Sequence, residues 1–137
     1  MNVTQIPFVE KVGVKRSEQG LLELAFSEGV QNHLKTIHAC AQFTLAETAS
    51  GEILQTKFPE LVGKVIPVLR DSQIKFKKPA TKSIIAVSSV SSESIQKFSD
   101  QFSKKGRALI SVDVEIKDIE NTVTCVGKFN WFVQSIK

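Results

Sequence analysis

One long stretch with almost no charge, from Ala39 to Gly51, constrains the fold of this chain more than any other segment. It contains a single charged residue, Glu47, and is otherwise mostly apolar or small around the whole circumference of a helix. With Thr36 as a suitable N-cap, a helix is predicted from Thr36 to about Leu54. A helix without a polar face is buried on every side, whereas a single sheet covers only one side. We therefore expect a second covering surface, most simply a second copy of the same chain. The residues that recur at helical spacing are Ile37, Ala41, Leu45 and Thr48.

The flanking segments predict an antiparallel sheet that wraps this helix, which is an α+β architecture. Residues 108–116 alternate between polar and apolar side chains, as in a strand with one buried and one exposed face. A second, amphipathic helix is predicted over 92–105, with Ser92 as its N-cap and Gly106 as its stop. Residues 6–9 indicate a short helix or a lid. Further strands are expected at 12–15 and 21–26 around a turn at Gln19-Gly20, and at 65–79, 83–88 and 122–133.

Length and composition limit the class of protein. The 137 residues predict a single domain over 1–137, and 42% hydrophobic with 23% charged residues are ordinary for a globular chain. The net charge of +4 is spread along the chain and tyrosine is absent, which argues against a nucleic-acid partner. No apolar run reaches the ~18 residues of a membrane helix, and the first residues lack the pattern of a secretory signal. The two cysteines, Cys40 and Cys125, form no CxxC pair, so a cytoplasmic location without disulfides is expected.

Glu47 is the strongest candidate for a functional residue. Its neighbours three and four residues away in the helix are Phe43, Thr44 and Gly51, and no Lys or Arg lies within a helical turn of it. A buried carboxylate without a partner has a raised pKa, and such groups commonly transfer protons or attack a substrate. Two structural alternatives remain open. The side chain could reach solvent, or it could pair with a distant lysine such as Lys75.

The start of the long helix is a second candidate site. The first N–H groups of a helix carry partial positive charge, so those of His38, Ala39 and Cys40 could polarise a carbonyl oxygen. Glu47 lies about 13 Å further along the axis, so only two antiparallel helices from two subunits could bring both groups to one carbonyl. Cys40 could act as a nucleophile, but no base lies at local spacing, and a small core residue is the favoured interpretation. The spacing of His33 and His38 does not match a zinc helix, so no metal is expected.

At these residues the sequence resembles the hot-dog superfamily of acyl-CoA thioesterases. The branch it resembles most is that of the phenylacetyl-CoA (PaaI-type) thioesterases and their small relatives. The family pattern has an Asn six residues before His-Gly-Gly, and Leu-Ala-Asp/Glu nine residues after that His. Here Asn32, His38 and Glu47 stand at this spacing. Later segments that resemble the family's central strands are Ile74-Lys75-Phe76-Lys77-Lys78-Pro79-Ala80, and Lys105-Gly106-Arg107-Ala108 followed by Val112-Asp113-Val114.

The resemblance implies a hot-dog fold, with a curled antiparallel sheet around one long helix, and homodimers joined edge to edge that can pair into tetramers. It implies hydrolysis of an acyl-CoA thioester at a site between subunits, with coenzyme A as part of the substrate and no other cofactor. The Ala39 N–H would then hold the thioester oxygen, and Glu47 of the partner subunit would activate water or attack directly. Asn32 and His38 would orient the carbonyl or the water. The candidates for binding coenzyme A phosphates are Lys104, Lys105 and Arg107.

Four departures from the family pattern bear on activity. Lys35 stands where Gly is common, Ala39 and Cys40 replace the two glycines after the His, and Leu69 falls where some members have a catalytic Ser or Thr. The departures at Ala39, Cys40 and Leu69 favour an alternative function, a non-catalytic acyl-CoA binding or sensing module. The retained Glu47 favours the enzyme. A hot-dog dehydratase is a third candidate, but the Asp-His pair typical of its helix entrance is missing here.

Overall fold

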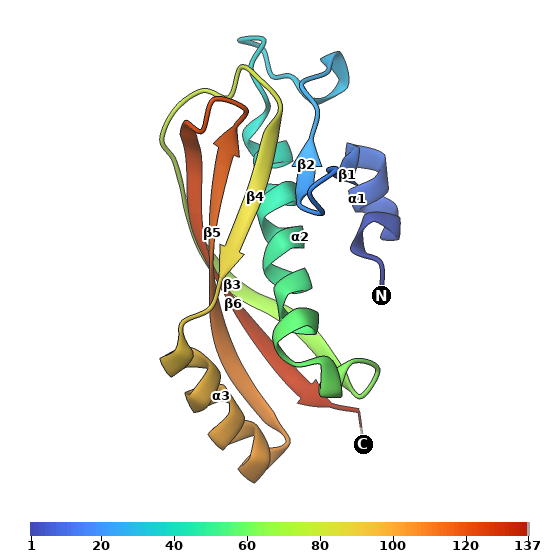
Figure 1. The fold of residues 1–137 in the computed structure, drawn as a ribbon, viewed down its shortest axis with the longest axis vertical. Coiled ribbons are helices and arrows are strands. Elements are labelled where there is room, and N and C mark those ends of the chain that lie inside the picture. Colours follow the sequence, from blue (N-terminus) through green and yellow to red (C-terminus); the bar gives the residue numbers. More distant parts are fainter. Residues whose placement is uncertain (137) are drawn as a thin grey trace.

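Six strands form one antiparallel sheet that curls around a single long helix, α2 (Figure 1). The computed structural model describes residues 1–136. The strand order is β1-β2-β4-β5-β6-β3, so β3 lies at one edge of the sheet. This arrangement confirms the predicted α+β architecture. The elements are η1 (Val3–Gln5), α1 (Pro7–Val12), β1 (Val14–Arg16), β2 (Leu22–Leu24), η2 (Glu28–Val30), α2 (Ala39–Lys57), η3 (Pro59–Leu61), β3 (Val65–Phe76), β4 (Ile84–Ser89), α3 (Ser92–Lys105), β5 (Arg107–Asp118) and β6 (Val123–Ser135).

The core lies between α2 and the concave face of the sheet. On β5 every second residue from Ala108 to Ile116 is buried, which confirms the predicted strand with two unlike faces. Leu45 of α2 and Phe129 of β6 are both fully buried. Burial of each such side chain contributes about 1.5–3 kcal/mol to stability. The pleat of the sheet therefore holds α2 in place along its length.

The long helix begins at Ala39 rather than near Thr36, and His38 is its N-cap. The prediction of a Thr36 cap is wrong because the Thr36 hydroxyl accepts a hydrogen bond from the Asn32 side chain instead. The amide of Ile37 then donates to the Ala80 carbonyl, so the chain stays extended up to the cap. The second helix covers the predicted residues 92–105. Its N-cap is not the expected Ser92 but the preceding serine, whose hydroxyl accepts from the Ser94 amide.

Lys35 adopts a left-handed backbone conformation, with φ of +62°. A side chain in this region costs about 1 kcal/mol relative to glycine. The turn that leads into α2 thus has the conformation for which glycine is best suited. Lys35 therefore makes this conformation less favourable than glycine would, although the chain still adopts it.

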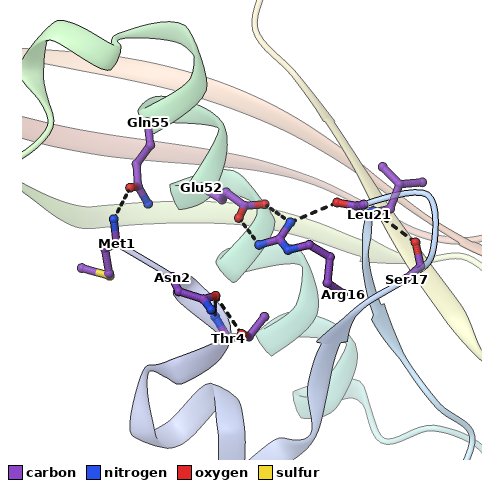
Figure 2. Close-up of polar contacts among 9 residues, drawn as sticks. Met1, Asn2, Thr4, Arg16, Ser17, Leu21, Glu52 and Gln55 are labelled. Carbon is purple, nitrogen blue, oxygen red and sulfur yellow. Dashed lines mark hydrogen bonds and ion pairs between the residues drawn. The ribbon is translucent and has the colours of Figure 1, made fainter.

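Part of the second covering surface of α2 comes from the same chain. Helix α1, which lies outside the sheet, packs against α2. Figure 2 shows the Arg16 guanidinium of β1 paired with the Glu52 carboxylate, and the main-chain nitrogen of Met1 donating to Gln55. The second surface, expected most simply from another copy, is therefore supplied in part by the chain itself. No helix within residues 1–136 is both long and apolar enough to cross a membrane.

Candidate active site

A cavity of about 560 Å³ lies between α2, the first half of β3, the last part of β6 and the N-terminal segment. The α2 wall includes Phe43, Glu47 and Gly51, and the sheet wall includes Leu69 and Trp131. Most of the lining side chains are apolar, and Glu47 is the only ionisable side chain among them. An apolar pocket with few polar groups is the usual form of a small-molecule site.

The structure confirms that Glu47 is half-buried on the long helix. Within the described residues, no hydrogen bond or ion pair engages its carboxylate, and Lys75 lies exposed on β3 without contacting it. Burial raises the pKa of the Glu47 carboxyl. A carboxylate with a raised pKa in an apolar pocket is well suited to accept a proton near neutral pH.

The raised pKa predicts how Glu47 affects stability. The folded state binds this proton more tightly than the unfolded state, so ionisation of Glu47 lowers the free energy of unfolding as the pH rises through the folded-state pKa. We expect Glu47→Gln to raise the free energy of unfolding by about 0.5 kcal/mol at pH 7, a small gain because more than a third of the carboxylate is exposed and solvent screens its charge. The gain should vanish below about pH 4, where the carboxyl is protonated in both states. Urea unfolding at both pH values checks this, and an equal gain at both would contradict it.

At the start of α2 only one of the three candidate amides is free. The His38 amide donates to the Val30 carbonyl at 2.8 Å, and the Cys40 amide donates to Nδ1 of His38 at 2.9 Å. The Ala39 amide has no hydrogen-bond partner anywhere in residues 1–136. The prediction of three available donors is therefore corrected to Ala39 alone. Because Nδ1 accepts, a neutral His38 carries its proton on Nε2, where it can act as a donor.

The Asn32 side chain shapes the loop before α2. Its oxygen accepts from the amides of Leu34 and Thr36, and its nitrogen donates to the Thr36 hydroxyl. Asn32 is therefore a positioning residue for the helix start in this chain. The structure does not bring it, or His38, to the cavity that Glu47 lines.

The two cysteines differ in environment. Cys40 is exposed at the first turn of α2, so its interpretation as a small core residue is wrong; the helix begins there at the surface. Cys125 is fully buried on β6, and burial raises the pKa of its thiol to about 11.

Across residues 1–136, no group of three or more His, Cys, Asp or Glu side chains could hold a metal ion.

The three basic candidates for phosphate binding lie far from the helix start. Lys104 and Lys105 end α3, Arg107 begins β5, and all three are exposed. This end of the molecule is the one at which α2 terminates, opposite to the end at which Ala39 begins α2 (Figure 1). None of the three lines the cavity, so one chain does not unite them with Glu47.

Trp131 and Gly51 shape the cavity wall together, a contact that the sequence did not predict. The indole nitrogen of Trp131 donates to the Ser50 hydroxyl at 2.9 Å. A Cβ at Gly51 would lie only 3.1 Å from the same indole ring, so a larger residue there would require the ring to shift by a few tenths of an ångström. Leu69 pairs with Trp131 across β3 and β6 and faces the cavity without a hydroxyl. The sequence does contain one indication of this packing. Gly51 stands in the interior of a helix, where glycine lowers stability by about 1 kcal/mol relative to alanine and so indicates a packing reason for its presence.

Comparison with known proteins identifies both a family and a fold. A family model described as a domain of unknown function (DUF4442) matches residues 4–133. A probable thioesterase of unknown function from Pseudomonas aeruginosa superposes with a TM-score of 0.82 at 22% identity, covering 97% of this chain and 91% of that one. A thioesterase from Haemophilus influenzae gives 0.74 at 16% identity, covering 98% and 87%. A Bacillus halodurans protein crystallised with CoA gives 0.71 at 20% identity, covering 92% and 74%. No curated protein matches the chain. These superpositions confirm the hot-dog fold.

Proposed function

Because the chain belongs to the DUF4442 family and has the hot-dog fold, we propose that it hydrolyses acyl-coenzyme A thioesters. The observation that carries the proposal is the unpaired, half-buried Glu47 carboxylate in an otherwise apolar cavity. Two of the similar structures are described as thioesterases and another was crystallised with CoA. These relatives support the choice of substrate class for this chain.

Glu47 serves as the base in the proposed reaction. Its carboxylate takes a proton from water as the water oxygen attacks the thioester carbon, and the carbonyl oxygen gains the negative charge. The Ala39 N–H donates to this oxygen, because it is the donor that the helix start leaves free. When the carbon–sulfur bond breaks, the proton passes from Glu47 to the departing thiolate. Direct attack by Glu47, followed by hydrolysis of an anhydride, leads to the same products.

The proposed site is shared by two subunits. Ala39 and Glu47 of one chain are eight residues apart on α2, about 12 Å along the axis, so they cannot meet at one carbonyl. The edge strand β3 is twelve residues long and exposes Ile66 and Val68. Long apolar edges favour pairing with another strand. A homodimer joined through β3 would place the Ala39 amide of one protomer opposite Glu47 of its partner.

The phosphate contacts of coenzyme A stay a proposal for Lys104, Lys105 and Arg107. Their charges suit phosphate, and in a dimer they can approach a substrate that is bound mainly by the other protomer.

The competing function is an acyl-CoA sensing module. Leu69 favours this second function. It lines the cavity without a hydroxyl, at the position where some of the hot-dog thioesterases that the sequence resembles have a Ser or Thr.

A thiol-release assay with a panel of acyl-CoA substrates separates the two functions. We expect the wild-type protein to release free coenzyme A with saturation kinetics, and to run as a dimer in light scattering. Binding of acyl-CoA without thiol release would contradict hydrolysis and support the sensing module. A stable monomer with full activity would contradict the shared site.

A further inference from the structure

The cavity is elongated along α2. Its helical wall runs from Phe43 to Phe58, about 22 Å at 1.5 Å per residue. The opposite wall contains alternate residues of β3 from Val65 to Leu69, about 13 Å of strand. Both walls are mostly apolar over the part between Glu47 and the C-terminal end of α2, where Thr48 and Gln55 are the polar lining residues. The space is therefore long in the direction that leads away from the carboxylate.

Aromatic side chains lie at the end of the cavity that is distant from Glu47. Phe58 and Phe98 both line it, and their ring centroids lie 4.8 Å apart. Phe98 comes from α3 and is only 2% exposed. Phe102 stacks behind it at 5.5 Å and does not line the cavity. Two contacting aromatic rings, one of them stacked on a third ring, therefore bound the cavity at this end.

We propose that the cavity binds the unbranched hydrocarbon chain of a long acyl group, and that Phe98 sets the longest chain that fits. The acyl carbonyl lies near Glu47, and the terminal methyl group reaches Phe58 and Phe98. The proposal rests on the proposed function for the reaction but not for the binding. A straight chain fills an elongated apolar space, whereas a compact aromatic group leaves its distant part empty. Each added methylene should strengthen binding roughly fourfold until the chain meets the end wall.

Trp131 provides a direct readout of binding. It is the only tryptophan of the chain, and its indole lines the cavity. Titration with unbranched primary alcohols, from octanol to hexadecanol, avoids charge repulsion with the Glu47 carboxylate. We expect the change in Trp131 emission to give affinities that rise roughly fourfold per methylene and then level off or fall. Phenethyl alcohol should bind more weakly than decanol.

Variants of the end wall test the role of Phe98. Phe98→Leu should move the best-bound alcohol to a longer chain, and Leu54→Phe, which adds bulk to the same part of the cavity, should move it to a shorter one. Phe102→Leu is the matched control, because it alters the same aromatic stack outside the cavity and should leave the optimum unchanged. Phe98→Ala removes more of the side chain than Phe98→Leu does. Because Phe98 is buried, this variant is more prone to unfold, and Phe98→Leu is the variant used for the test.

The outcomes separate this inference from the proposed function. Affinities that do not depend on chain length, tightest binding of phenethyl alcohol, or an optimum that moves equally in Phe98→Leu and Phe102→Leu would overturn the inference. A length optimum that moves with Phe98 in a protein that releases no thiol would support the inference and refute the hydrolase. Thiol release at equal efficiency for all chain lengths would support the hydrolase and refute the inference about chain length.

Discussion

Glu47→Gln is expected to lower kcat by about 10²–10⁴-fold, the range for loss of a general base. Glutamine keeps the size of the side chain and its place in the cavity wall, but it cannot accept the proton from water. Because this transfer occurs only in the transition state, kcat and kcat/KM should fall by the same factor. Steady-state thiol release from a saturating acyl-CoA measures the effect.

Glu52→Gln is the matched control for this prediction. Glu52 lies on the same helix, pairs with Arg16 and does not line the cavity. We expect its activity to match the wild type, with a small loss of stability from the broken ion pair. Equal rates for the wild type and Glu47→Gln would refute the role of Glu47 as the base.

Ala39→Pro is expected to reduce kcat by about 10²–10³-fold, as seen when an oxyanion donor is removed. Proline at the first position of a helix lacks only an N–H that makes no bond within the helix. The preceding residue, His38, already has the extended backbone that proline requires, with ψ of 140°. The substitution should therefore delete the donor and leave the melting temperature nearly unchanged.

Two further measurements define this result. Ala39→Gly keeps the N–H and should retain activity, so a loss in this variant would indicate that the methyl group matters rather than the donor. Mixing Glu47→Gln with Ala39→Pro subunits should restore about a quarter of wild-type activity, because half the dimers then contain one intact site of two. No recovery on mixing would place both groups in one subunit and contradict the shared site.

Local sequence pattern accounts for much of the fold. The alternation along 108–116 depends on the pleat of a single strand, and the structure confirms it. The apolar stretch around Glu47 marks a buried helix because it has almost no charge on any side, and Glu47 is the one carboxylate that lines the cavity. The second helix is bounded by Gly106, whose φ of +70° closes the last turn. Each of these features arises from neighbours within a few residues.

By itself, then, the sequence determined the class of fold, the buried helix and the place of Glu47 within it, because an uncharged stretch and strand alternation are local properties. That Glu47 is unpaired was decided by the tertiary structure. Only the tertiary structure decided where the helix starts, since the Val30 and Ala80 carbonyls hold the chain extended up to His38. It alone left the Ala39 amide free. It also brought Phe98, forty residues beyond Phe58, to the end of the cavity. Contacts between such distant segments depend on how the whole sheet curls, and no pattern within one segment specifies them.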